Sequence, residues 1–335
     1  MRSLRLLLVI HLVACTLDVA GHTDDDDQEE DDDDEDGPVP PPPDSACAEV
    51  PDAGPSGSWR HTSSTLVAHL GDPHHRGIDL VAAADDAVQT LGGRLTYGPT
   101  DKDLEDEDVD VFACANGTWE NLGRATTDDE GRFTLALSDA QRLPVGVHDL
   151  YLSVVGDRTG VPFVGLVAPT GTPVVVSDVD GTLTASENAY PTTLALGGDV
   201  GVHPSAPQAL AAAASRGAQV VYLTARGDRF TQDTRDWLAA NGFPKGPLRM
   251  PTAIITLPGD ETVELKTNLL LSLSAFELSA GVGNRASDIT AYTNVGLSPD
   301  RIFIKGPEFD DETGSQIAAG MATRFIDYAT LVPTL

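Results

Sequence analysis

A change of sequence period near residue 173 constrains the fold of this chain more than any other feature. From Val174 onward, short apolar runs alternate with stretches of helical spacing. A parallel strand is buried on both faces, so it reads as a continuous apolar run. We expect strands at 174–176, 218–223, 248–257, 278–282 and 301–304, and helices at 204–216, 229–241, 263–276, 286–294 and 315–331. This order predicts an α/β domain with a doubly wound parallel sheet over residues 169–335.

A different pattern occupies residues 59–168, where short apolar segments are separated by turn residues. We expect strands at 65–70, 93–97, 109–113, 123–126, 132–137, 148–155 and 161–167. Their regular spacing predicts an antiparallel, immunoglobulin-like β-sandwich. His74 and His75 are adjacent, so on a strand they would face opposite sides and poorly suit one metal. We interpret both histidines as surface residues of a loop.

The first residues are typical of a targeting signal. Arg2 and Arg5 precede an apolar run at 6–13 that is too short to span a bilayer. The run ends in Leu-Val-Ala-Cys, with the cysteine at Cys15, and this resembles a bacterial lipobox. The resemblance implies a signal peptide at 1–14 and a lipid on Cys15. An ordinary secretory signal that contains a cysteine is the alternative, and either places the mature protein outside the cytoplasm.

An acidic and proline-rich segment follows the signal. Residues 24–36 are all acidic apart from Gln28, and prolines dominate 38–43. Such a composition cannot bury a core, so residues 15–58 are expected to form a disordered tether. Together with the lipid on Cys15, it would hold the folded domains near the periplasmic or outer surface of a bacterial membrane.

Overall charge and cysteine content limit the other possibilities. The formal net charge of -31 argues against a nucleic-acid partner, because binding to phosphate backbones needs a basic face. Cys47 and Cys114 are the two cysteines besides Cys15. They could pair in an oxidising compartment, and pairing would attach the tether to the first domain. The sequence does not show whether they are close enough, so both possibilities stay open.

Two carboxylates follow the first strand of the α/β domain. Asp178 and Asp180 flank Val179, and Gly181 comes next. One carboxylate can attack phosphorus while the other moves the proton of the leaving group. Mg²⁺ would offset the repulsion between two carboxylates and a phosphate. The alternative is a turn that merely ends the strand, but ligands of such sheets bind at the carboxyl ends of the strands.

Further polar residues fall near the ends of later strands. Thr224 can donate to a phosphoryl oxygen, and Arg226 beside it suits either a phosphate contact or an exposed helix start. Lys266 is placed at the opening of a helix, where it can neutralise a nucleophile and a phosphoryl group. Asp288 and Asn284 follow the strand at 278–282 and offer oxygen ligands to Mg²⁺.

The segment Ser-Asp-Val-Asp-Gly-Thr at 177–182 resembles the DxDGT signature of the haloacid-dehalogenase superfamily. The resemblance implies phosphate monoester hydrolysis through an aspartyl-phosphate on Asp178. It also implies roles for the residues around the phosphate. These are Asp180 as acid and base, Thr224 and Lys266 as catalytic contacts, Gly181, Thr182 and Arg226 as substrate contacts, and Asp178, Asp180, Asp288 and Asn284 around Mg²⁺.

The segment Gly-Asn-Arg-Ala-Ser-Asp at 283–288, with Arg-Ile-Phe at 301–303, is similar to the lipin family of phosphatidate phosphatases. Trp-Leu at 237–238 with Asn-Gly-Phe-Pro at 241–244 is also similar to the related phosphatidate-sensing domains of phosphatidylinositol-transfer proteins. The resemblance implies phosphatidate as the leading substrate. The alternatives are a phosphatidate-binding module without turnover and a phosphatase of a soluble phosphoester.

Overall fold

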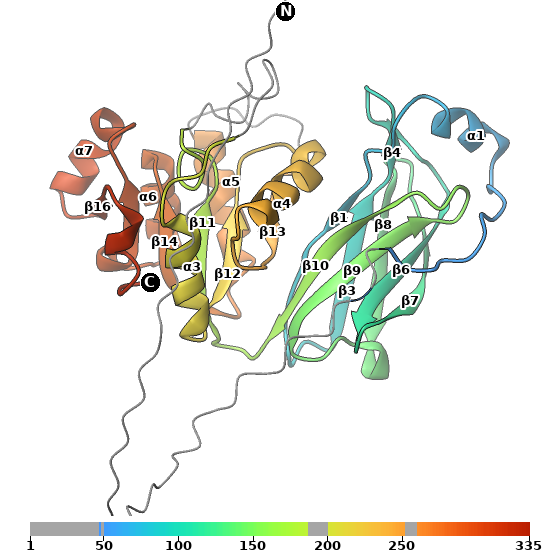
Figure 1. Cartoon of the computed structure of the whole chain (residues 1–335), viewed down its shortest axis with the longest axis horizontal. Coiled ribbons are helices and arrows are strands. Elements are labelled where there is room, and N and C mark those ends of the chain that lie inside the picture. The colour runs from blue at the N-terminus through green and yellow to red at the C-terminus, as the bar shows by residue number, and fades with distance from the viewer. Residues whose placement is uncertain (1–46, 48–49, 187–199, 252–259) are drawn as a thin grey trace, which may run out of the picture. The chain divides into compact units, whose positions relative to one another are not determined.

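The computed structural model describes residue 47 and residues 50–186, 200–251 and 260–335 (Figure 1). The predicted signal peptide, Cys15 and most of the predicted tether lie outside these residues. The described residues all belong to one compact unit of the chain. Within the described residues, no helix is long and apolar enough to cross a membrane.

A β-sandwich forms the first domain, as the turn spacing predicts, and its strands pair antiparallel except for the edge strand at 80–83, which runs parallel to its neighbour. One sheet has the order β2 (Leu80–Ala83), β10 (Gly160–Ala168), β9 (Gly146–Val154), β6 (Asp108–Ala115) and β7 (Thr118–Thr126). The other has the order β1 (Arg76–Ile78), β3 (Val88–Arg94) and β8 (Arg132–Ser138), and β4 (Thr96–Tyr97) pairs with β5 (Lys102–Asp103). Leu91, Val111, Leu137 and Leu150 are fully buried in a core to which both sheets contribute. Alternating apolar side chains therefore bury one face of each sheet.

Two details of this domain differ from expectation. The predicted strand at 65–70 is instead helix α1 (Thr62–Ala68), in which Leu66 is 72% exposed while Val67 packs against the sandwich core. A segment of six residues is too short for its apolar positions to distinguish the helical period from the strand period. His75 is also not a surface residue, because it is buried between the ring edge of Tyr97 and Thr159. Burial disfavours the charged imidazole and lowers the pKa of His75 to about 4.

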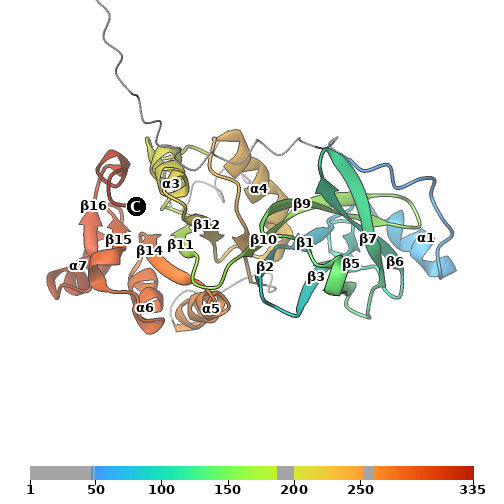
Figure 2. The same ribbon diagram turned by 90° about the horizontal axis from the view of Figure 1, so that it is seen from below.

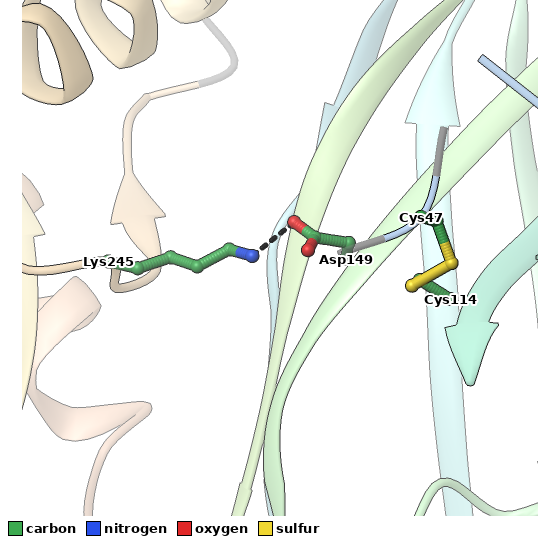
Figure 3. Close-up of a disulfide and its surroundings, with 4 residues drawn as sticks. All are labelled: Cys47, Cys114, Asp149 and Lys245. Carbon is green, nitrogen blue, oxygen red and sulfur yellow. Dashed lines mark ion pairs between the residues drawn. A yellow bond between two sulfur atoms is a disulfide. The ribbon is translucent and has the colours of Figure 1, made fainter. Parts of the chain in front are cut away.

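A disulfide joins Cys47 to Cys114 on β6 (Figure 3). The two Cα atoms lie 5.9 Å apart, within the usual range for a disulfide. The open question of their pairing is thus resolved in favour of pairing. Residue 47, which falls within the predicted tether at 15–58, is attached covalently to the sandwich.

A six-stranded parallel sheet forms the core of the second domain, as predicted. Its order is β13 (Leu248–Arg249), β12 (Gln219–Leu223), β11 (Pro173–Asp178), β14 (Glu277–Gly283), β15 (Ile302–Lys305) and β16 (Thr323–Phe325). The chain adds strands on one side of β11 and then returns to add β14 on its other side. The order of the strands reverses beside β11, which is where ligands bind in sheets of this kind.

Helices cover both faces of this sheet (Figures 1 and 2). Helices α3 (Ala206–Ser215) and α4 (Thr231–Ala240) contribute Leu210 and Leu238 to the core on one face. Helices α5 (Asp260–Leu271) and α6 (Ala286–Asn294) contribute Leu270 and Ile289 to the core on the other. The sandwich followed by this α/β domain confirms the fold class expected from the sequence.

The C-terminal region departs from the predicted helix at 315–331. Helix α7 (Asp310–Ala318) ends before Gly320, whose φ of +75° lies in the left-handed region that favours glycine. The chain then forms β16, which pairs with β15, and the 3₁₀ helix η4 (Tyr328–Thr330). The predicted strand at 248–257 is seen only as β13, because residues 252–259 lie outside the described residues. Three further 3₁₀ turns are η1 (Asp139–Gln141), η2 (Asp228–Phe230) and η3 (Pro299–Arg301).

Candidate functional site

Asp178 ends β11, and the loop after it curls back toward its carboxylate. Gly181 has a φ of +66°, which lets the chain turn sharply there. Thr182 Oγ1 then donates a hydrogen bond of 3.0 Å to Asp178 Oδ2. The hydroxyl of Tyr328, in η4, donates to the Thr182 carbonyl over 2.7 Å and fixes the loop from the far end of the chain.

Lys266 provides the positive charge beside Asp178. Its Nζ donates to Asp178 Oδ1 over 2.7 Å and to Asp288 Oδ1 over 2.5 Å. The lysine side chain is 5% exposed, and the two carboxylates are equally buried or more so. Burial alone lowers the pKa of Lys266, but the charges of Asp178 and Asp288 outweigh that effect and raise it. Lys266 is therefore a permanent cation, and it lies within α5 rather than at its start.

Asp288 stands in the first turn of α6 and is fully buried. Its Oδ2 accepts hydrogen bonds from the backbone N–H groups of Asn284 and Arg285, at 3.1 and 3.0 Å. A Cβ at Gly283 would lie 2.5 Å from the Asp288 side chain, so only glycine fits there. Both oxygens of Asp288 thus serve protein groups. In the structure it caps the helix and holds Lys266, and its predicted role as a Mg²⁺ ligand stays a prediction.

Asp180, Thr224 and Arg226 form a second group beside the first. Arg226 approaches Asp180 as a fork, with Nη2 2.6 Å and Nε 3.0 Å from Asp180 Oδ1. Thr224 is fully buried just past β12, and its Oγ1 donates to Asp180 Oδ2 over 2.9 Å. Arg226 Nη1 donates to Thr234 Oγ1 of α4 over 2.8 Å. A planar guanidinium matches a carboxylate or a phosphate equally well.

The oxygen donors around Asp178 suit a hard cation that keeps much of its water. Among the described residues, no three His, Cys, Asp or Glu side chains are grouped as metal ligands. The register pairs Ser177 with Val282, so Asn284 follows β14 beside the end of β11. The oxygens that could serve a cation here are the carboxylates of Asp178 and Asp288, the backbone carbonyl of Asp180 and the side-chain carbonyl of Asn284. Mg²⁺ is commonly held by one or two carboxylates together with water and substrate phosphate, so this donor set fits it.

The sequence motifs predicted most of these neighbours, and the structure adds others. Asp178, Thr182, Lys266 and Asp288 meet in one cluster, and Asp180, Thr224 and Arg226 in the next. The residues that the sequence analysis missed support the loops of the site from elsewhere in the chain. They are Tyr328, which holds Thr182, Thr234, which holds Arg226, and Thr184, whose Oγ1 accepts the N–H of Gly181 at 2.8 Å. Of these, only Thr184 is close to the motif in sequence, two residues after its last residue, Thr182, so its hydroxyl could have been noticed.

Two family models match the described domains. Residues 175–306 match the LNS2 domain of PITM 1-3, and residues 73–167 match the β-sandwich domain of PITM 1-3. Membrane-associated phosphatidylinositol transfer protein 3 of Homo sapiens is 30% identical over 263 residues, covering 77% of this chain and 26% of the relative. Protein retinal degeneration B of Drosophila melanogaster is 32% identical over 238 residues, covering 70% of this chain and 18% of the relative. The chain thus spans about a quarter or less of the length of these relatives.

Solved structures of two phosphatases share part of the α/β architecture. D,D-heptose 1.7-bisphosphate phosphatase from B. bronchiseptica, complexed with magnesium and phosphate, is 14% identical with a TM-score of 0.34, covering 48% of this chain and 96% of that one. The class C acid phosphatase from Bacillus anthracis is 15% identical with a TM-score of 0.31, covering 47% of this chain and 66% of that one. Similarity at this level carries no inference about substrate or activity.

Proposed function

We propose that this chain, which is distantly homologous to the membrane-associated phosphatidylinositol transfer proteins and has an LNS2-type, haloacid-dehalogenase-like domain, is a phosphatase. It hydrolyses a phosphate monoester through an aspartyl-phosphate on Asp178. Phosphatidate is the leading substrate, because the motifs at 177–184 and 283–288 resemble those of lipin phosphatidate phosphatases.

The convergence of Asp178, Lys266 and Thr182 carries this proposal. A nucleophile needs an ionised carboxylate, and Lys266 is a buried cation 2.7 Å from Asp178 Oδ1. The same ammonium can neutralise a phosphoryl oxygen as charge moves onto it. A site that only bound phosphate would gain nothing from a buried carboxylate facing the anion.

The proposed reaction has two steps that share Asp178 and Asp180. Asp178 Oδ forms a bond to phosphorus while the bond to the departing alkoxide breaks, and Asp180 gives the alkoxide a proton. Water then attacks phosphorus and gives its proton to Asp180, and the Asp178–phosphorus bond breaks to release phosphate. Thr224 and Lys266 hold phosphoryl oxygens, with Gly181, Thr182 and Arg226 as further substrate contacts. Mg²⁺, which would be held by Asp178, the Asp180 carbonyl and Asp288 with Asn284 nearby, would offset the charge of the phosphate.

A second candidate function is phosphatidate binding without turnover. The fork of Arg226 on Asp180 favours it, because a carboxylate held by a guanidinium is poorly prepared to donate a proton. If a substrate phosphate bound Arg226 in place of Asp180, the carboxylate of Asp180 would be free to transfer a proton. The similarity to membrane-associated phosphatidylinositol transfer proteins supports a lipid ligand in either case.

A panel of phosphate monoesters, assayed with and without Mg²⁺ on the soluble domains, tests the proposal. Asp178→Asn is expected to abolish phosphate release, because the amide keeps the size of the side chain but cannot attack phosphorus. Asp180→Asn should slow turnover by about 10²- to 10⁴-fold and let aspartyl-phosphate accumulate, detectable by mass spectrometry. Binding to phosphatidate vesicles without release from any monoester would favour the second candidate. Turnover of soluble esters alone would remove phosphatidate as substrate.

A further inference from the structure

Asp79, in the β-sandwich, has a buried carboxylate that contacts residues of the α/β domain. Its side chain is 0% exposed, and it lies between β1 and β2. Within the sandwich, Asp79 Oδ1 accepts a hydrogen bond of 2.8 Å from the backbone N–H of Val164 in β10. A carboxylate this deeply buried needs charged or multiple hydrogen-bond partners.

Those partners come from the α/β domain. Arg235 of α4 donates to both carboxylate oxygens, through Nη2 at 2.9 Å and Nη1 at 3.2 Å. The backbone N–H of Leu248, in β13, donates to Oδ2 over 2.7 Å. Arg249 Nη1 donates to the Asp79 carbonyl over 3.0 Å. A single residue of the sandwich therefore holds one helix and one strand of the other domain.

The same helix and strand hold the second group of the candidate site. Thr234, next to Arg235 on α4, accepts Nη1 of Arg226. The carbonyl of Arg249 accepts the backbone N–H of Thr224 over 3.1 Å. Arg226 and Thr224 donate hydrogen bonds to the carboxylate of Asp180. Asp79 is thus linked to Thr224 through Arg249, and to Arg226 through Arg235 and its neighbour Thr234.

The sandwich also holds the chain between Arg226 and α4. Arg76, 3% exposed, forms an ion pair of 3.2 Å from its Nε to Asp228 Oδ2. Arg229 Nη1 donates to the carbonyl of Pro99 over 2.8 Å. The segment that begins at Arg226 is thus fixed to the sandwich at its start through Asp228 and Arg229, and at its end through Arg235.

We propose that Asp79 is a positioning residue of the site, through which the β-sandwich keeps Arg226 and Thr224 aligned on Asp180. The activity that this alignment serves rests on the proposed function, but the alignment itself does not. The sandwich is then part of the working site rather than an independent module beside it.

Hydrogen exchange measured by mass spectrometry on the chain lacking the signal peptide tests the alignment directly. Asp79→Asn keeps the size of the side chain but removes the charge that Arg235 pairs with. Backbone exchange over 224–235 and 248–249 is expected to rise by about 10-fold or more, because hydrogen bonds to a buried charge are lost. If that variant folds poorly, Asp79→Asn combined with Arg235→Gln leaves a neutral amide pair and gives the second measurement.

Two control variants separate positioning from general loss of stability. Asp149→Asn removes an exposed ion pair with Lys245 that also joins the two domains (Figure 3), and it should leave exchange over 224–235 unchanged. Leu137→Ala creates a cavity in the sandwich core far along the sequence from Asp79, and it should lower stability without this local increase. Exchange that stays unchanged in Asp79→Asn, or rises equally in Leu137→Ala, overturns the proposal.

Enzyme kinetics on the same variants provide an independent test of the role of Asp79. With Asp180 misaligned, kcat for a phosphate monoester should fall by about 10-fold or more, since proton transfer requires hydrogen-bond geometry, and KM should rise as well because Thr224 and Arg226 are also substrate contacts. A change confined to KM would overturn the link from Asp79 to Asp180. If the wild-type chain hydrolyses no monoester, the proposed function fails, and the exchange measurements alone decide whether Asp79 positions the site.

Discussion

Lys266 is the residue on which the candidate site depends most for stability. It is the shared cation between two buried carboxylates, Asp178 and Asp288. Lys266→Met keeps the length of the side chain but removes the cation that both buried carboxylates share. We expect the free energy of unfolding to fall by about 3–5 kcal/mol, measured by urea denaturation.

The matched control for that variant is Lys102→Met. Lys102 pairs with Glu105, and both side chains are about half exposed, so the change should cost at most about 1 kcal/mol. Equal stability of Lys266→Met and the wild type would contradict the buried triad of charges described above.

His75 makes the stability of the sandwich depend on pH. Its folded pKa is about 4, below the usual 6.5 of the unfolded chain, so on acidification the unfolded state takes up a proton first. Stability is therefore fully present above pH 6.5 and falls as the pH drops toward 4, by about 3 kcal/mol in total. His75→Gln retains a hydrogen-bonding amide near Thr159 and should flatten this part of the profile. Thermal unfolding of both proteins across this range measures the difference, and identical slopes would rule out His75 as the cause.

The chemical identity of the site residues could be read from the sequence, but their contacts could not. Asp178, Asp180, Thr224 and Lys266 follow or accompany successive strands, so the parallel sheet had to bring them to one edge. Their present partners depend on side-chain direction and on remote segments. Tyr328 and Thr182 are 146 residues apart in the sequence, so no local sequence pattern could predict their hydrogen bond. Likewise, only the three-dimensional arrangement shows that Arg226 holds Asp180 rather than solvent.

Among the elements, the disulfide on β6 lends itself to a direct test. It closes a loop whose ends are 67 residues apart in the sequence. In the chain-entropy model, a loop of this length stabilises the folded state by about 4 kcal/mol. The double variant Cys47→Ala with Cys114→Ala should lose about that much, as measured by chemical denaturation. Wild-type protein unfolded under reducing conditions should match the double variant. Equal stability of the oxidised wild type and the double variant would show that the bond constrains nothing.

The type of secondary structure could be predicted where the hydrophobic period extended over a long segment, and the prediction failed where the segment was short. The α6 prediction agrees with the structure because its apolar positions recur over two full turns and a strand precedes it closely. The segment at 315–331 mixes Ala, Gly and Thr, and it became a helix, an edge strand and a 3₁₀ turn. β16 forms because Phe303, Ile304 and Lys305 of β15 offer it a pairing edge. Pairing with β15 depends on the tertiary structure, so the β propensity of the segment alone could not predict β16.

At the scale of the whole molecule, charge bears on how the protein would meet a membrane. The net charge of -31, much of it in the acidic run at 24–36, repels anionic lipid surfaces. Attachment by electrostatics alone is therefore disfavoured, and the proposed lipid on Cys15 would have to carry it. The location outside the cytoplasm stays a prediction, and an oxidising compartment there would permit the disulfide.

Cys15→Ser is expected to move the protein from the membrane fraction to the soluble fraction, or to block its processing, because one thiol carries the proposed anchor. Fractionation of cells expressing each form, followed by mass spectrometry of the mature N-terminus, measures both effects. Thr16→Ser serves as the control, since it changes the residue beside Cys15 without removing the thiol or the disulfide. Unchanged fractionation and processing of Cys15→Ser would show that the lipobox interpretation is wrong.

The central claim, that Asp178 is the nucleophile of a phosphatase, is tested most directly by phosphate release from phosphatidate in mixed micelles. Wild type, Asp178→Asn and the exposed-site control Asp149→Asn would be compared at saturating Mg²⁺ and after chelation. We predict Mg²⁺-dependent release by the wild type and the control, and none by Asp178→Asn. Release by Asp178→Asn at a rate close to that of the wild type would contradict the account.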